Sequence, residues 1–277
     1  MTHWVPNSSA CWASPNIRRV ALSGSIPLTL KTALRLFSAS VIDLLFAGRS
    51  FFCYSSIMEK EILALEKDAL QLGIVLNEYQ LGQFAAYHKE LLKWNEKTNL
   101  ISDKSSREIV RRHFLDSLTA LKFIEKRNIR IVDIGCGAGF PGIPLKIATP
   151  TLQLYLVETN RKKVSFLKHI ICLLNLSDVF VLHERVENLL KIDERQGFFD
   201  VLISRAAFKL PAMLTFGAFF LRPYGKLIAF KGGDLPIEFS QAAAVTQLYG
   251  FGQLFQYDIN QEFSDIPRKI IVGEKIK

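Results

Sequence analysis

The fold is decided by the stretch Ile129-Arg130-Ile131-Val132-Asp133-Ile134-Gly135-Cys136-Gly137-Ala138-Gly139-Phe140-Pro141-Gly142. Its first six residues form a largely apolar run typical of a buried strand, and the glycines after them predict a tight turn into a helix. Glycine lets the backbone adopt positive φ and approach a ligand closely, and Pro141 suits the first turn of a helix. The stretch therefore predicts a nucleotide-cofactor site in a doubly wound α/β fold.

The nature of the cofactor depends on Asp133, which ends the predicted strand. Residues 137–142 match the dinucleotide pattern G-x-G-x-x-G, but one such match is weak evidence. A carboxylate there would repel a pyrophosphate at the helix N-terminus, whereas it would suit the sulfonium and amino groups of S-adenosylmethionine. The order Asp133, Gly135, Gly137, Gly139 is similar to the first motif of the class I S-adenosylmethionine methyltransferases. We therefore expect these residues to bind the cofactor, with the carboxylate pointing toward it. A tight turn in some other α/β protein is the alternative.

Composition restricts the class of protein. The chain has 277 residues, 49% of them hydrophobic, which is ample for a folded core. Its formal charge of +9 is compatible with a polyanionic partner. The four cysteines show no C-x-x-C spacing and the five histidines form no ligand cluster, so we predict reduced thiols and no metal site. No apolar run reaches the roughly 18 residues of a membrane span, so we predict no membrane segment.

Residues 1–57 differ from the rest of the chain. They are rich in serine, carry five basic side chains but only one acidic one, and show no sustained period. We predict that they lie outside the folded enzyme, as a transit peptide or a mis-assigned start. Residues 58–127 are predicted to form an N-terminal helical segment packed on a catalytic domain at 128–277. The expected location is the cytoplasm, or an organelle if residues 1–57 are a transit peptide.

Sequence signals for helices precede the glycine-rich stretch, and predicted strands and helices alternate after it. Asn77 with Gln80 predicts a capping box, and Ser105 or Ser106 is expected to cap a further helix that reaches about residue 125. Beyond residue 128 we predict strands at 129–134, 152–158, 179–182, 199–203, 226–231, 251–258 and 269–273. Helices are expected near 142–148, 160–175, 186–191, 208–221 and 234–249. This order predicts a Rossmann-like, mostly parallel seven-stranded sheet with helices on both faces.

Two further strand ends carry polar residues that fit a cofactor. Glu158 closes the second predicted strand, where an acid in a Rossmann-like fold reaches the ribose hydroxyls. An ordinary surface glutamate is the alternative. Thr159 and Asn160 follow it and are expected on the adenine side. In class I methyltransferases a backbone amide and a neighbouring acid after the third strand commonly hold the adenine, which points to Val186 and Glu187.

The fourth predicted strand ends in Ser204-Arg205-Ala206, the position that faces the transferred methyl group in this fold. No Asn/Asp-Pro-Pro-aromatic run occurs there, and neither Cys136 nor Cys172 is placed as a nucleophile. The acceptor is therefore expected to be an atom with a free lone pair. We expect Arg205 to act in the site and its replacement by alanine to reduce methyl transfer more than stability. Basic residues recur at this edge and fit a phosphate-contacting patch, although charge runs are usually solvated faces: Arg111, Arg112, Arg161, Lys162, Lys163, Arg205 and Lys209.

His113 and Asp116 share one face of a predicted helix. A lone histidine on a helix is more often structural, here paired with Asp116, than catalytic. The helix leads directly into the first strand, so both interpretations stay open.

Taken together, these segments resemble the small-subunit ribosomal RNA guanine-N7 methyltransferase family, also called glucose-inhibited division protein B. The resemblance spans about residues 58–275. It rests on Lys93-Trp94-Asn95-Glu96-Lys97-Thr98-Asn99-Leu100, Arg112-His113-Phe114-Leu115-Asp116-Ser117, the glycine-rich stretch through Pro144, Arg161-Lys162-Lys163, Arg185-Val186-Glu187 and Ser204-Arg205-Ala206.

The resemblance implies a chemistry and a set of site residues. It implies S-adenosylmethionine as cofactor, bound at Gly135, Phe140, residues 158–160, Val186, Glu187 and Arg205, with Arg205 and His113 as positioning residues. The implied substrate is N7 of a guanine in 16S ribosomal RNA, at the guanine-527 site, in naked RNA or a small-subunit assembly particle. We expect a monomer. The family has nothing matching residues 1–57, and Lys269 stands where it often has histidine.

Two other functions stay open at this point. The chain could be a class I methyltransferase for a small molecule or a protein, or a non-catalytic RNA-binding domain that retains the fold.

Overall fold

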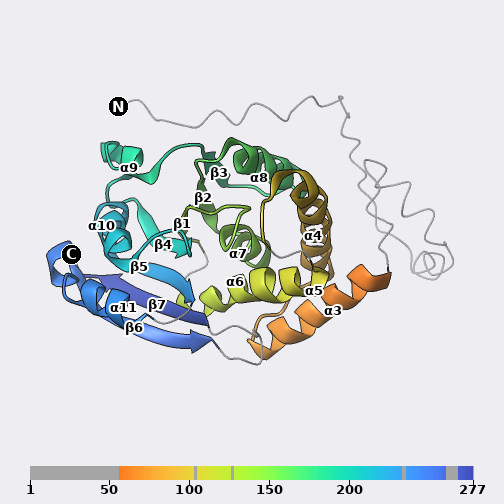
Figure 1. Ribbon diagram of the computed structural model, residues 1–277, viewed down its shortest axis with the longest axis horizontal. Coiled ribbons are helices and arrows are strands. Elements are labelled where there is room, and N and C mark those ends of the chain that lie inside the picture. Colours follow the sequence, from red (N-terminus) through yellow and green to blue (C-terminus); the bar gives the residue numbers. More distant parts are fainter. Residues whose placement is uncertain (1–55, 103–104, 126–127, 233–234, 260–267, 277) are drawn as a thin grey trace, which may run out of the picture. The chain divides into compact units, whose positions relative to one another are not determined.

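The structure is a computed structural model that describes residues 56–102, 105–125, 128–232, 235–259 and 268–276. These residues form one seven-stranded sheet in the order β3-β2-β1-β4-β5-β7-β6 (Figure 1). Strands β1 to β5 run parallel, and β7 is antiparallel to both of its neighbours. This confirms the predicted mostly parallel sheet. The strands are β1 (Arg130–Ile134), β2 (Gln153–Val157), β3 (Val179–Leu182), β4 (Phe199–Arg205), β5 (Leu221–Gly232), β6 (Phe251–Ile259) and β7 (Arg268–Lys275).

Helices connect the parallel strands and cover both faces of the sheet. They are α7 (Gly142–Ala148), α8 (Arg161–Leu173), α9 (Val186–Leu189), α10 (Leu210–Phe220) and α11 (Pro236–Ala243). Val132 and Ile134 of β1 point to the face where α9, α10 and α11 pack, in a core that includes Met213 and Leu214. The residue between them, Asp133, therefore points to the opposite face, which carries α7. The predicted helix at 234–249 is shorter than expected and is followed by a 3₁₀-helix, η4 (Gln247–Tyr249).

The N-terminal helices are α3 (Ser56–Gln71) and α4 (Glu78–Thr98). The predicted capping box at Asn77 and Gln80 is confirmed, because each donates its backbone amide to the other's side chain at 2.9 Å. The side-chain amide of Gln80 donates from Nε2 to Ile147 O of α7 at 2.8 Å, and that of Gln83 donates from Nε2 to Leu174 O after α8 at the same distance. Buried glutamines thus hold α4 against α7 and α8.

The helix expected between residue 105 and about residue 125 is not continuous. Ser105 caps it as predicted, but it consists of α5 (Ser106–Ile109), a π-helix η1 (Val110–Leu115), α6 (Asp116–Leu118) and a 3₁₀-helix η2 (Thr119–Phe123). The π-helix lies where Arg205 of β4 contacts this segment.

The predicted extension at 1–57 lies outside the described residues, except that α3 begins at Ser56, slightly before the predicted boundary. In the described part of the chain, no helix combines the length and apolarity that crossing a membrane requires.

Candidate functional site

The glycine-rich turn between β1 and α7 forms the centre of the site. Gly135, Gly137 and Gly139 have φ values of +68°, +61° and +103°, a region that residues with a Cβ rarely adopt. A Cβ atom on Gly142 would lie 2.8 Å from Leu156 and 2.9 Å from Asp133 Oδ2, so glycine is needed there for close packing of α7 on the sheet. A Cβ atom on Gly137 would meet only Lys163 Nζ at 3.9 Å, which leaves the backbone open to a ligand.

Asp133 does not point out toward a ligand as we expected. Its side chain is fully buried, and Oδ2 accepts the backbone amide of Gly142 at 2.8 Å. Among the described residues, Oδ1 is buried without a hydrogen-bond partner. Burial raises the pKa of this carboxyl group well above its usual value, although the Gly142 amide and Arg205 oppose the shift. The carboxylate therefore fixes the start of α7 and retains one free acceptor.

Glu158 lies where the sequence placed it, at the end of β2 beside the glycine turn. Its Oε2 accepts the amide of Gly137 at 2.9 Å, and Oε1 accepts the amides of Thr159 and Asn160 at 2.8 Å each. The side chain of Asn160 caps α8 by accepting the amide of Lys162 at 2.9 Å. These bonds hold one carboxylate at the edge of the turn, within reach of the same ligand as Gly137.

The end of β3 lies next to Glu158. His183 Nε2 lies 3.0 Å from Thr159 O, which ties the two strand ends together. Val186 is buried at the start of α9, while Glu187 is exposed. The structure thus brings Gly137, Glu158 and the loop before Val186 to one edge of the sheet, as predicted.

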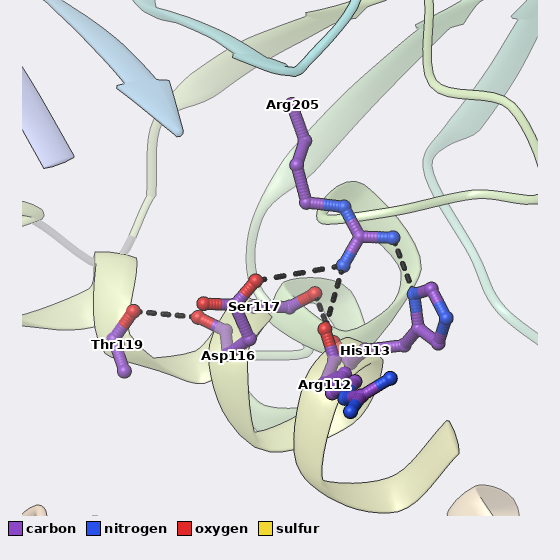
Figure 2. A network of polar contacts seen from close by, with 6 residues as sticks. All are labelled: Arg112, His113, Asp116, Ser117, Thr119 and Arg205. Carbon is purple, nitrogen blue, oxygen red and sulfur yellow. Dashed lines mark hydrogen bonds and ion pairs between the residues drawn. The ribbon is translucent and has the colours of Figure 1, made fainter. Parts of the chain in front are cut away.

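Arg205 at the end of β4 forms a network with the broken helix (Figure 2). Its Nη2 lies 2.5 Å from His113 Nδ1, and Nη1 donates to Arg112 O at 3.0 Å. Nη1 also lies 3.6 Å from Asp116 Oδ2, and both side chains are buried, at 12% and 2% exposure. Our interpretation that Asp116 pairs with His113 is wrong, because Arg205 bonds the imidazole nitrogen and pairs with the carboxylate.

The π-helix changes the hydrogen-bond pattern around the carbonyl of Arg112. In an α-helix this carbonyl would accept the amide of Asp116. Here the amide of Asp116 donates instead to Arg111 O and His113 O. The carbonyl of Arg112 accepts the guanidinium of Arg205 from β4. The irregular turn of the helix therefore coincides with the insertion of a side chain from another element.

The contacts of Arg205 determine the protonation states of His113 and Asp116, and this network does not supply a general base. A guanidinium only donates, so His113 Nδ1 must accept and its proton must lie on Nε2. Burial lowers the pKa of Arg205, and Asp116 opposes the shift. Burial also raises the pKa of Asp116, against the influence of Arg205 and Arg268. Arg205 and Asp116 therefore depend on each other for their charged forms.

Aromatic rings join this network to the glycine turn. The Phe140 ring stacks on His113 with centroids 4.8 Å apart, and the Arg205 guanidinium lies 4.9 Å from its centroid. Tyr87 of α4, which the sequence did not single out, stacks on Phe140 at 5.5 Å. Its hydroxyl donates to Ala138 O within the turn at 2.6 Å. The one signal for Tyr87 was its spacing of three residues from Phe84 on an amphipathic helix.

The predicted basic residues differ in their exposure and in their contacts. Arg161 and Lys162 are exposed at the start of α8, Lys209 is exposed before α10, and Lys163 is half-buried with its Nζ near Gly137. Arg112 pairs with Glu108 at 2.9 Å. The described ranges hold no group of three or more His, Cys, Asp or Glu side chains arranged to bind a metal ion.

Comparison with known proteins gives a consistent family. Residues 80–265 match the family described as rRNA small subunit methyltransferase G. The ribosomal RNA small subunit methyltransferase G of Syntrophus aciditrophicus is 44% identical over 186 residues, covering 67% of this chain and 77% of that protein. The protein of the same name from Chloroflexus aggregans is 37% identical over 204 residues, covering 74% and 85%.

Solved structures with little sequence similarity share the fold. Haemonchus contortus phosphoethanolamine N-methyltransferase 2 superposes with a TM-score of 0.51 at 12% identity, covering 67% of this chain and 60% of that one. The [4+2]-cyclase SpnF superposes with a TM-score of 0.50 at 15% identity, covering 73% and 97%. One is a methyltransferase and the other a cyclase, so this likeness indicates architecture alone.

Proposed function

Since the chain belongs to the rRNA small subunit methyltransferase G family, we propose that it transfers a methyl group from S-adenosylmethionine to N7 of a guanine in 16S ribosomal RNA. The proposed position is the guanine-527 site that the family resemblance implies. Family membership supports a methyltransferase that acts on small-subunit ribosomal RNA. The choice of N7 is the one that the family resemblance implies, and the chemistry of the site agrees with it.

The residues around the glycine turn fit S-adenosylmethionine. Gly137 leaves its backbone open to a ligand, and the buried Glu158 carboxylate beside it suits ribose hydroxyl donors. Asp133 instead fixes the start of α7 from the buried side of the turn. The Glu158 carboxylate at the edge of the turn favours a ribose-bearing ligand and disfavours a pyrophosphate. This carboxylate, which accepts the backbone amide of Gly137, is the observation that carries the cofactor assignment.

The reaction needs positioning more than proton transfer. When bound, S-adenosylmethionine supplies an electrophilic methyl group. Guanine N7 has an in-plane lone pair and no proton to lose, so no general base is required. Arg205 only donates hydrogen bonds, and His113 Nδ1 is occupied by it, which fits residues that orient rather than deprotonate. Phe140 and Tyr87 stack on each other and are buried beside the turn, which suits a site that keeps water from the reacting groups.

The RNA substrate must present its guanine outside a regular helix. N7 lies in the deep groove of A-form RNA, which side chains cannot enter, so the target base should lie in a loop or be opened out. Arg161 and Lys162 are exposed beside the Glu158 end of β2, and the chain has a formal charge of +9. Both features support contact with RNA phosphates near the proposed donor site.

Labelled methyl transfer tests the proposed function. Purified protein is incubated with labelled S-adenosylmethionine and either naked 16S RNA or small-subunit particles from cells that lack the protein. Label in RNA, with chain cleavage by borohydride and aniline at one N7-methylguanosine, is the expected result. Label in another base atom overturns N7, and label only in protein or small molecules overturns the RNA substrate. RNA binding without label would indicate a non-catalytic domain.

Glu158→Gln tests the cofactor assignment separately. It removes the negative charge while keeping an acceptor for the Gly137 amide, so S-adenosylmethionine should bind about 10- to 100-fold more weakly, equivalent to about 1.5–3 kcal/mol. The matched control is Glu90→Gln, which removes another partly buried carboxylate, one that bonds His169 at 2.8 Å. Calorimetry with S-adenosylmethionine gives both affinities. Equal affinities in the two variants would contradict the ribose role.

A further inference from the structure

The loop between β4 and α10 lies directly against the first glycine of the turn. A Cβ atom on Gly135 would lie 2.6 Å from Ala207 Cβ and 3.2 Å from the Phe208 ring. Ala206, just after Arg205, has φ of +57°, which is costly for a residue other than glycine. Such a conformation persists only where surrounding contacts fix it. Residues 206–209 therefore form a fixed wall beside Gly135.

A partly buried ion pair from two other elements fixes this loop, with the Lys231 side chain 8% exposed and that of Glu238 22% exposed. Lys231 at the end of β5 donates to Phe208 O at 2.5 Å and pairs with Glu238 of α11 at 2.6 Å. The same Glu238 oxygen accepts the amide of Leu210 at 2.6 Å. The residue before α10, Lys209, provides no side-chain cap, so Glu238 caps this helix from α11. One lysine and one glutamate thus bind both ends of the segment Phe208–Leu210.

We propose that Lys231 and Glu238 are positioning residues that hold loop 206–209 in the shape needed to bind S-adenosylmethionine beside Gly135. This inference rests on the proposed function of the glycine turn as the cofactor site. Lys231 is only 7% exposed, so the pair lies beneath the loop and acts through it. Truncating either partner would leave the other charge buried and free the loop to move.

The chain offers a matched control at the opposite end of the same helix. Lys275 of β7 donates to Ala218 O at 2.7 Å and to Leu221 O at 2.6 Å, at the C-terminal end of α10. Lys275→Met therefore removes a lysine that anchors α10 through carbonyl groups but does not contact loop 206–209. A purely structural role for Lys231 predicts the same consequences for both substitutions.

Cofactor binding and loop protection separate these possibilities. For Lys231→Met we expect S-adenosylmethionine to bind at least about tenfold more weakly, the equivalent of one charge-assisted hydrogen bond. Hydrogen exchange at residues 206–210 should also become faster. Lys231→Arg, which keeps the charge and its donors, should stay near wild type. Glu238→Gln, which keeps an acceptor for Leu210, should show a smaller loss than Lys231→Met. Lys275→Met should lower the melting temperature with cofactor affinity unchanged.

Two outcomes would overturn the inference in distinguishable ways. Equal cofactor affinities in folded Lys231→Met and Lys275→Met, or in Glu238→Gln and wild type, would overturn the positioning role alone. If Lys231→Met does not fold, the Glu238→Gln comparison decides. Wild-type protein that fails to bind S-adenosylmethionine in calorimetry would overturn the proposed function, and this inference with it.

Discussion

Replacing Arg205 by alanine removes a cation that pairs with the carboxylate of Asp116 and donates hydrogen bonds to Arg112 O and His113 Nδ1. The guanidinium lies 3.6 Å from Asp116 Oδ2, and the Asp116 side chain is only 2% exposed. Alanine leaves that charge buried, with no hydrogen bond to either oxygen among the described residues and with Arg268 as the remaining cation that acts on it. It also removes the guanidinium that donates to Arg112 O.

The expected loss of stability follows from the buried charge. Breaking a buried ion pair by deleting one partner costs about 3–5 kcal/mol, mostly because the remaining charge is unpaired. The sequence predicted that this variant would lose more methyl transfer than stability. The contacts of Arg205 add a stability loss of this size to the expected loss of activity. Methyl transfer should be lost as well, because His113 and Phe140 lose the group that orders them.

Urea unfolding of three proteins tests the magnitude: wild type, Arg205→Ala and the double variant Arg205→Ala with Asp116→Asn. The second substitution removes the unpaired charge, so it should recover all but about 1–2 kcal/mol, the cost of imperfectly bonded polar groups. Arg205 lowers the pKa of Asp116, so its removal raises that pKa further above the unfolded value of 3.8. A carboxyl with a raised folded pKa gains stability as pH falls through that pKa.

The deficit of Arg205→Ala relative to wild type should therefore shrink between pH 7 and about pH 4. The double variant should show less of this dependence, because asparagine does not titrate. An Arg205→Ala protein as stable as wild type at pH 7, or a deficit that the second substitution deepens, would refute the reasoning.

Two other predictions concern the glycine turn and α4. Gly142→Ala should lose about 1–3 kcal/mol by overpacking against Leu156 and Asp133. In Gly137→Ala the added Cβ meets no close atom, so the variant should lose only the roughly 1–2 kcal/mol of folding stability that a φ of +61° costs alanine. The methyl group should nevertheless obstruct the binding of S-adenosylmethionine. Thermal melts and cofactor titrations of both variants check this contrast. Burial lowers the pKa of His88 from 6.5 to about 4, so the folded state loses about 3 kcal/mol as pH falls from 6.5 to 4. His88→Phe should abolish that part of the acid sensitivity, and urea midpoints that fall equally in both proteins would contradict it.

The sequence by itself determined the features that depend on neighbouring residues. The capping box at Asn77 needs only a glutamine three residues later, and it formed as predicted. Alternation of apolar runs and helix signals after residue 128 predicted the strands, because each period reports burial within one element. Three glycines in five residues predicted a turn with positive φ, since that backbone region excludes most other residues.

Site residues could be listed from the sequence, but their partners could not. Asp133 was correctly placed at the end of β1, yet its carboxylate faces the Gly142 amide rather than outward. A strand residue's face is set by the register of the sheet and by the packing of α7, which local sequence does not encode. The cofactor residues were therefore proposed from their positions at strand ends in the sequence, whereas their hydrogen-bond partners are set by the fold.

Only the tertiary structure decided the network around Arg205 and the pair that fixes its loop. Arg205 meets His113 across 92 residues of chain, and Lys231 reaches Phe208 across 23. No spacing rule connects such positions. The same guanidinium bonds the carbonyl of Arg112 within the irregular helix after Ser105, and no local pattern predicts that contact. Local sequence sets the preference of each segment, and the packing of distant segments decides where a buried charge finds its partner.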